Sequence, residues 1–144
     1  MTVEVRTAAF DPWIEVSRYQ NTLLARHGKY GATASFVGTL RDHNQGDAVR
    51  EMTLEHYPGM TEKFMQRICD EAAQRWDILD TLIIHRCGRL QINDPIVLVA
   101  VWSAHRAAAF AACQYLIDEL KHRAPLWKQE SLETGTRWVE QNTP

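Results

Sequence analysis

Cationic side chains gather near both ends of one segment in the second half of the chain. The segment from Ser103 to Lys128 reads SAHRAAAFAACQYLIDELKHRAPLWK. It carries a cationic pair near its start and a cationic cluster near its end: His105 and Arg106, then Lys121, His122 and Arg123. A basic residue at the start of a helix opposes the helix dipole, so the first pair indicates a negatively charged ligand. Cations at a helix end stabilise the helix itself, but Lys128 lies beyond Pro125 and has no helix to stabilise. These residues predict a local anion site.

The same segment is predicted to form one long helix. Ser103 is the expected N-cap, and the helix should end near His122 or Arg123 because Pro125 disfavours helical geometry in the residue before it. Four apolar residues then share one face that we expect to be buried. These residues are Phe110, Cys113, Ile117 and Leu120.

The length of this helix separates its two cationic ends. At a rise of about 1.5 Å per residue, His105 and Lys121 stand roughly 24 Å apart along one helix. They cannot share a small-molecule site within one chain. Our hypothesis is a two-fold dimer in which one subunit contributes the His/Arg end and the other contributes the lysine end.

Length and composition fit a single globular domain that spans residues 1–144. The chain has 144 residues, of which 45% are hydrophobic, and this is enough to bury a core. The formal net charge of −2 provides no general basic field, so no nucleic-acid partner is expected. The N-terminal segment resembles neither a secretory signal nor a transmembrane span, so we expect no membrane association and a cytoplasmic location.

The cysteines and histidines lack the spacing of a metal or disulfide framework. Cys69, Cys87 and Cys113 are odd in number and widely spaced, so we interpret each as a small buried apolar side chain. The six histidines show no helical zinc spacing, and no metal is predicted. The sequence also contains no glycine-rich nucleotide loop and no serine nucleophile elbow.

The first half of the chain predicts strands and helices in alternation. Residues 2–7 alternate as a short strand, and Asp11 before Pro12 begins a helix that ends near Gly28. The predicted buried stripe of that helix is Trp13, Val16, Leu23 and Leu24. Residues 31–40 predict a strand with residues 51–57 as its partner. Arg41, in the polar loop between them, offers a fork of donors that matches phosphate oxygens.

The second half predicts a helix, two buried strands and the long helix. Thr61 is the expected N-cap of a helix. Helical spacing predicts that its buried face consists of Phe64, Ile68, Ala72 and Trp76. Residues 80–87 and 95–102 predict strands, and the second should be covered on both faces because it is apolar throughout. A turn at Thr134 and Gly135 precedes a final apolar pair. The class predicted is α+β, with two or three helices against a mixed or antiparallel sheet.

Five sequence blocks, taken together, resemble the large, catalytic subunit of molybdopterin synthase. They are FVGTLRDHN from Phe36, LEHYPGMTEK from Leu54, HRCGRL from His85, SAHR from Ser103 and LKHRAPLWKQE from Leu120. The blocks occur in the family's order and cover most of the chain from Gly31 to Val139. Their combination is specific, whereas any one block alone would be weak.

The resemblance implies an enzyme of molybdenum cofactor biosynthesis. Such an enzyme converts cyclic pyranopterin monophosphate (precursor Z) to molybdopterin by inserting two sulfur atoms as a dithiolene. Members of the family receive the sulfur from a small ubiquitin-like subunit that ends in a Gly-Gly thiocarboxylate. The resemblance also implies a homodimer of large subunits with one small subunit at each end, which makes a heterotetramer, and an α/β hammerhead fold with an additional antiparallel β subdomain. No cofactor of its own is implied.

The site residues carried over by the resemblance coincide with the cationic positions. The lysines of the L-K-x-R-A-P and P-x-W-K motifs fall on Lys121 and Lys128, which the resemblance implies are catalytic. Substrate-binding positions implied across the dimer are Arg41, His105 and Arg106. The implied substrate-binding set also includes Lys121, Lys128 and the neighbouring Thr39, Leu40, Gln129 and Glu130.

The chemistry expected of the lysines has two forms that the sequence leaves open. A lysine stabilises an oxyanion as a cation, or acts as a base or nucleophile if its amine is deprotonated. Because the partner brings the sulfur, no cysteine of this chain need be a nucleophile. Two rival interpretations are a non-catalytic docking module for a ubiquitin-like protein and a small RNA-binding domain.

Overall fold

The computed structural model describes residues 1–132 and 135–139, and the predicted turn residue Thr134 lies outside them. Strands and helices follow the chain in mixed order. They are β1 (Thr2–Arg6), α1 (Pro12–Gln20), the 3-10 helix η1 (Leu24–Arg26), β2 (Ala32–Thr39), β3 (His43–Asn44), β4 (Asp47–His56), α2 (Met60–Arg75), β5 (Asp80–Arg86), β6 (Gly88–Gln91), β7 (Pro95–Ser103), α3 (Arg106–Arg123), β8 (Leu126–Leu132) and β9 (Gly135–Trp138).

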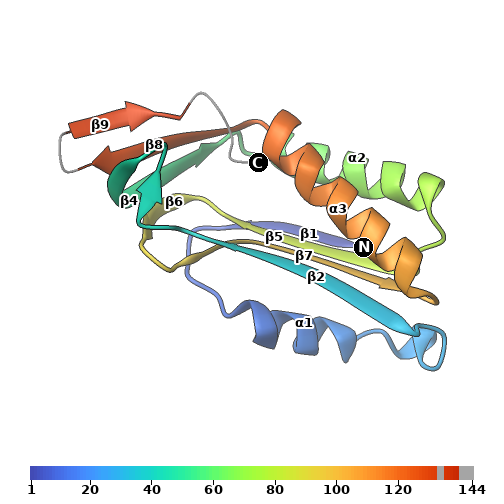
Figure 1. Ribbon diagram of the computed structural model, residues 1–144. Coiled ribbons are helices and arrows are strands. Elements are labelled where there is room, and N and C mark those ends of the chain that lie inside the picture. Colours follow the sequence, from blue (N-terminus) through green and yellow to red (C-terminus); the bar gives the residue numbers. More distant parts are fainter. Residues whose placement is uncertain (133–134, 140–144) are drawn as a thin grey trace.

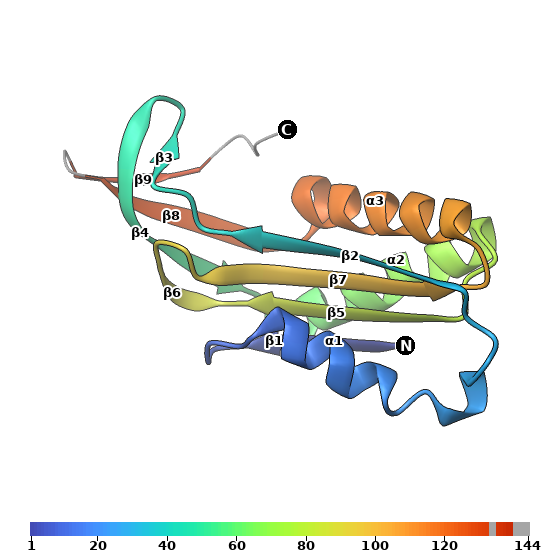
Figure 2. The ribbon, with the colours of Figure 1, turned by 60° about the horizontal axis from the view of Figure 1, so that its bottom comes forward.

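A four-stranded sheet in the order β1-β5-β7-β2 forms the larger half of the fold. β1 runs parallel to β5, whereas β5–β7 and β7–β2 pair antiparallel. Helices α2 and α3 cover one face of this sheet and α1 covers the other (Figures 1 and 2). In β7, Val97, Val99 and Val101 pack toward α2 and α3, while Leu98, Ala100 and Trp102 pack in the cluster on the α1 side. The prediction of a strand covered on both faces is confirmed.

A second, antiparallel sheet extends from one end of the first (Figure 1). It has the order β3-β4-β8-β9, and β6 also pairs with β4. Its small core is formed by Leu40, Val49, Met52, Leu54 and Leu90. The α+β class and the additional antiparallel β subdomain are therefore confirmed. The predicted partner of the strand at residues 31–40 was wrong, because β2 pairs with β7 whereas β4 pairs with β6 and β8.

Helix α3 ends where Pro125 predicts but begins later than expected. Its N-cap is His105 rather than Ser103, because Ser103 still pairs with Ala32 in the sheet. The Ser103 hydroxyl donates to the carbonyl oxygen of Asp77 at 2.9 Å and accepts from the His105 amide at 3.3 Å. The buried stripe of α3 is Ala109, Ala112, Cys113, Leu116, Ile117 and Leu120. Phe110, predicted to be in the core, is 67% exposed.

Helices α1 and α2 also differ from their predicted limits. α1 ends at Gln20, and the Thr22 hydroxyl then donates to the Tyr19 carbonyl at 2.6 Å in the turn that follows. Leu24 lies beyond the end of α1, and both Trp13 and Leu24 are exposed instead of buried. α2 has Gly59 at its N-cap, and the Thr61 hydroxyl instead donates to the carbonyl oxygen of Pro125 at 3.1 Å.

None of the helices in the described part of the chain combines the length and the apolar composition needed to cross a membrane.

Gly31 is a position where a side chain does not fit, and this gives a prediction on stability. A Cβ atom there would lie 2.5 Å from the carbonyl oxygen of Ala104, next to the start of α3. The Gly31 amide donates to the Ser103 carbonyl at 2.9 Å, so the two segments cannot separate without losing this bond. We expect Gly31→Ala to lower the free energy of unfolding by about 1–3 kcal/mol. Denaturant unfolding of this variant beside Ser35→Ala, at an exposed position in β2, is the measurement; equal midpoints would contradict the prediction.

Candidate active site

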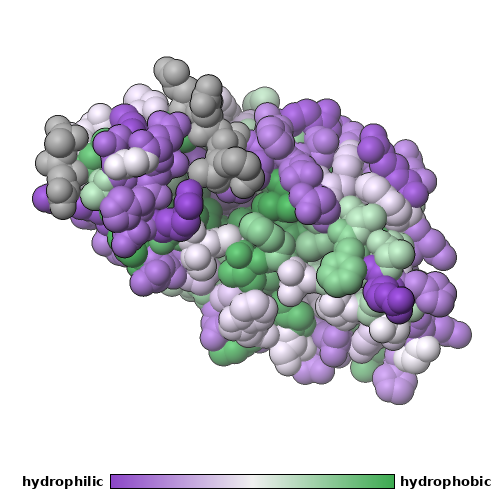
Figure 3. All heavy atoms as spheres, viewed as in Figure 1, coloured by the Kyte–Doolittle hydropathy of each residue, from purple (hydrophilic) through white to green (hydrophobic). Residues whose placement is uncertain are grey.

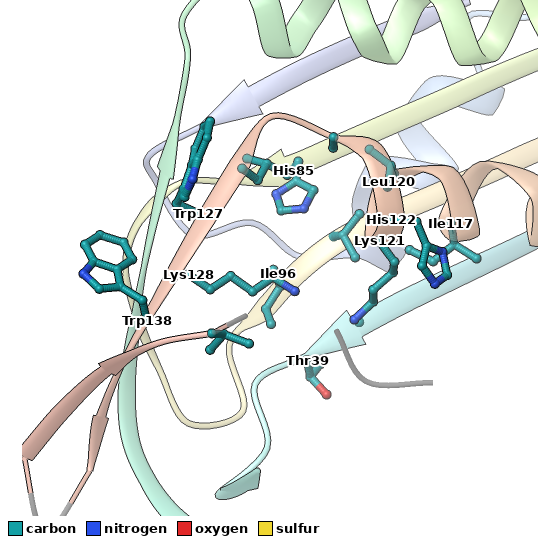
Figure 4. Close-up of a pocket in the computed structure, with 15 residues that line it drawn as sticks. Thr39, His85, Ile96, Ile117, Leu120, Lys121, His122, Trp127, Lys128 and Trp138 are labelled. Carbon is teal, nitrogen blue, oxygen red and sulfur yellow. The ribbon is translucent and has the colours of Figure 1, made fainter. Parts of the chain in front are cut away.

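A cavity of roughly 500 Å³ opens where the two sheets and the end of α3 meet. This volume is in the range of small-ligand pockets. Its apolar lining includes Ile96, Ile117, Leu120, Leu126, Trp127 and Trp138. Lys121, from the last turn of α3, and Lys128, from β8, project into it, and Figure 4 shows their side chains extending toward each other.

The environment of the two lysines lowers the pKa of both ammonium groups. Burial and, after it, the charge of Lys121 lower the pKa of Lys128 to about 8, while the charge of Glu130 opposes the shift. Burial also lowers the pKa of Lys121, and the charge of Arg41 acts in the same direction. Burial, which penalises the charged form, is the main cause of both shifts, and a neighbouring positive charge adds to it in each case. Perturbed lysines in a cavity are typical of a functional site.

A second, smaller and more polar pocket adjoins the first. Lys121, Lys128 and Thr39 line both. The other polar side chains of the small pocket are Arg41, His43, Asn44 and Glu130. The guanidinium and the two ammonium groups make this pocket suitable for an anion, because charge-assisted hydrogen bonds are the strongest that side chains offer.

Glu130 links the strands that carry the residues of the small pocket. It is 3% exposed, and its carboxylate accepts from Asn44 Nδ2 at 3.0 and 3.2 Å and from Arg137 Nε at 2.9 Å. Arg137 also pairs with Asp47 at 2.6 Å and donates to the Asn44 carbonyl at 2.8 Å. These bonds connect β3, β4, β8 and β9, so Glu130 has a structural task beside any contact with a ligand.

The structure brings most, but not all, of the residues implied by the resemblance to one place. Those that line one or both pockets are Thr39, Leu40, Arg41, Lys121, Lys128 and Glu130. Gln129 lies between two of them on β8 but lines neither pocket. His105 and Arg106 are exposed at the opposite end of α3, as the length of the helix predicts. Arg41 differs from the expectation of a contribution across the dimer, because it lies beside Lys121 of its own chain.

The cysteines lie apart from both pockets. All three are free and buried, and burial raises the pKa of Cys69 to about 12 and of Cys113 to about 11. The pKa of Cys87 is raised for the same reason. Since the thiolate is the reactive form, burial leaves these side chains inert. Their interpretation as buried apolar side chains is confirmed.

Several residues of the cavity had no assigned role in the sequence. The cavity is also lined by Trp127, Trp138, Ile96 and His85. His85 and Trp127 lie in two of the sequence blocks that resemble the family, whereas no sequence signal indicated Ile96 or Trp138. Within residues 1–132 and 135–139, no group of three His, Cys, Asp or Glu side chains could hold a metal ion.

Comparison with known proteins first gives the class. Over 99% of this chain and 90% of the other, the structure is similar to the molybdopterin biosynthesis MoaE protein from Burkholderia ambifaria MC40-6, with a TM-score of 0.79 and 47% identity. The fold is thus that of a class of proteins of molybdopterin biosynthesis. The chain is 52% identical to the molybdopterin synthase catalytic subunit of Ralstonia nicotianae, over 96% of this chain and 77% of that protein. It is 51% identical to the protein of the same name from Pseudomonas aeruginosa, over 97% and 91%.

The family model described as MoaE protein matches residues 11–123. The chain belongs to the MoaE protein family.

Proposed function

We propose that this chain is the catalytic subunit of a molybdopterin synthase. It converts precursor Z to molybdopterin by inserting two sulfur atoms that a thiocarboxylated small subunit supplies. The observation that carries the proposal is the pair Lys121 and Lys128, held together between an apolar cavity and a small cationic pocket. The relatives that carry the name molybdopterin synthase catalytic subunit, at 52% and 51% identity, support it.

The apolar cavity receives the C-terminal tail of the small subunit in this proposal. A Gly-Gly tail is narrow enough to enter a cavity lined by large side chains, and its thiocarboxylate would meet the two ammonium groups. Exposed aromatic residues surround the entrance: Trp127 packs edge-on against Tyr57 with ring centroids 4.6 Å apart, and Trp138 is 50% exposed. Aromatic side chains are enriched in protein interfaces. The relatives are named as the catalytic subunit of molybdopterin synthase, so those proteins belong to an enzyme with more than one subunit.

The lysines stabilise negative charge during sulfur transfer. The sulfur of the thiocarboxylate bonds to a substrate carbon as a carbon–oxygen bond of that carbon breaks and the oxygen leaves with the electron pair, which gives a thioester. Water then attacks the acyl carbon of the thioester, loses a proton and forms a tetrahedral oxyanion. Collapse of that oxyanion leaves a thiol on the substrate and a carboxylate on the partner. Ammonium groups fixed beside the acyl carbon stabilise the oxyanion without having to reorganise. The sulfur comes entirely from the partner, so the proposal requires no cofactor or metal in this chain and no reactive cysteine.

The phosphate of precursor Z is held by Arg41 from the same chain and by His105 and Arg106 from a second copy. Support for the second copy comes from apolar residues on the face formed by β2 and α3 (Figure 3). Phe110 on α3 is 67% exposed, Phe36 on β2 is 37% exposed, and β2 is an edge strand of its sheet. Exposed apolar patches of this kind mark interaction sites. With one small subunit on each copy, the assembly is a heterotetramer.

The proposal also covers the extent and the location of the enzyme. Residues 1–144 form a single catalytic domain, and the reaction takes place in the cytoplasm. Three free, buried cysteines are in keeping with a reducing compartment.

Reconstitution tests the proposed function directly. Purified chain, thiocarboxylated small subunit and precursor Z should together form the dithiolene, and omission of the thiocarboxylate should abolish it. Binding of the small subunit without any dithiolene would contradict the proposal and favour the docking module instead.

Mixed dimers test whether two copies share a site. Chains carrying His105→Ala and chains carrying Lys121→Ala should each be inactive alone. In a mixed dimer one site combines both defects and the other combines neither, so about half of the wild-type activity should return. The measurement is dithiolene formation by mixed dimers purified through two different affinity tags. Verified mixed dimers without activity would contradict a shared site.

A further inference from the structure

His85 places a buried hydrogen-bond acceptor in the apolar cavity. It lies on β5 with 5% of its surface exposed, and its ring lines the cavity beside Trp127 and Leu120 (Figure 4). Its Nδ1 lies 2.8 Å from the carbonyl oxygen of Arg86. A carbonyl oxygen only accepts, so Nδ1 must carry the hydrogen and donate. In the neutral ring Nε2 then has no hydrogen and is an acceptor.

The ring stays neutral under physiological conditions. Burial lowers the pKa of His85 to about 4, and the charges of Lys128 on β8, Lys121 on α3 and His56 on β4 act in the same direction. Its hydrogen bond to the Arg86 carbonyl opposes the shift without reversing it. The cavity therefore combines two cationic donors with one neutral acceptor.

An extended peptide in this cavity needs such an acceptor. Its backbone presents N–H and C=O groups in alternation, and a buried N–H without a partner costs free energy. Lys121, Lys128 and the indole groups of Trp127 and Trp138 only donate. The other side-chain acceptors of the cavity, Thr39 and His122, are exposed. His85 is thus the buried side chain of the described lining that can satisfy a backbone N–H.

We infer that His85 binds the C-terminal tail of the small subunit by accepting a hydrogen bond from one of its backbone N–H groups. The inference rests on the proposed function and adds a recognition element to it. The lysines bind the acyl end of the tail through its oxygen and sulfur atoms, while His85 fixes the chain behind it. This hydrogen bond sets the position of the tail along the cavity, because the acyl carbon lies beside Lys121 and Lys128 when the backbone N–H donates to Nε2 of His85.

A chemical double-mutant cycle tests this hydrogen bond. The probe is a small ubiquitin-like partner whose last three residues, ending in Gly-Gly with a free carboxylate, are attached by peptide ligation. Each of these three residues in turn carries an N-methylated backbone amide, which removes the donor. Dissociation constants are measured by calorimetry for wild-type chain and for His85→Phe. N-methylation at one position should weaken wild-type binding about tenfold and His85→Phe binding less than about twofold.

Two further variants separate the hydrogen bond from packing. His85→Gln retains an acceptor near the position of Nε2 and should bind the unmodified partner within about threefold of wild type. His122→Phe removes the ring nitrogens of a second histidine that lines the cavity and should keep the full effect of N-methylation. Thermal unfolding of each variant establishes that it is folded.

Each outcome of the cycle bears on a different claim. If N-methylation weakens wild type and His85→Phe equally at all three positions, or couples to His122 instead, the role of His85 is disproved. If deletion of the two glycines leaves the affinity for wild type unchanged, tail docking itself fails, and with it both the proposed function of the cavity and this inference.

Discussion

Replacing Lys121 by alanine should lower the rate of dithiolene formation by at least about 100-fold. Removal of one donor from an oxyanion site costs about 10²–10³ in rate, and Lys121 lines both the cavity and the small pocket. The effect should fall on the single-turnover rate constant at saturating thiocarboxylated partner, because the lost interaction is made with charge that develops during the reaction.

Matched variants show whether this loss is specific. Lys63→Ala removes an exposed lysine from α2 and should leave the rate unchanged. Cys113→Ala and Cys87→Ala should retain sulfur transfer, because both thiols are buried and neither lines a pocket. A folded cysteine variant unable to transfer sulfur would overturn the assignment of the sulfur to the partner. An active Lys121→Ala enzyme would overturn the assignment of a catalytic role to this lysine.

The rate of the wild-type enzyme should fall as the pH rises through about 8, with Lys128 as the cause. The pKa of its ammonium is about 8 in the folded chain, so roughly nine-tenths of the side chains are charged at pH 7. If the cation stabilises the oxyanion, activity is present below this pKa and is lost above it. The measurement is single-turnover rate from pH 6 to 10 at saturating partner. Lys128→Ala should lose about 100-fold at pH 7.

Lys128→Arg separates the two possible roles of this lysine. Arginine remains charged throughout the range, so the variant should keep a slower but flat profile between pH 7 and 9. A wild-type rate that rises through about pH 8, together with an inactive arginine variant, would show that the neutral amine is the working form. Our assignment of the cation would then be wrong.

The elements with strong periodicity could be predicted from the sequence. The buried face of α2, with Phe64, Ile68 and Ala72, and the doubly covered strand β7 follow from spacing alone. Pro125 marks the end of α3 because its ring excludes helical geometry from the residue before it. The position of His105 far from Lys121 follows from the rise of the helix.

What spacing could not reveal depends on contacts between distant segments. In the sequence, Lys128, Gln129 and Glu130 have the polar composition of a loop. In the structure they lie on strand β8, where Glu130 accepts hydrogen bonds from Asn44 and Arg137. Phe110 shares a helical spacing with Cys113, but the helix packs against the sheet through small residues such as Ala109. Packing small residues lets the backbone approach closely, and the larger ring turns outward. Likewise, alternation along β5 does not disclose that the ring of His85 lines a cavity together with two lysines.

The corner between α3 and β8 limits how the length of this protein can vary. Only Ala124 and Pro125 separate the helix from the strand, and the Thr61 hydroxyl holds the Pro125 carbonyl from outside the corner. An inserted residue would shift Lys128 along β8 by about 3.3 Å and turn its side chain to the other face of the strand. Insertions here should therefore inactivate the enzyme, whereas the stretch between α1 and β2 can accept them without altering the spacing of the two amines.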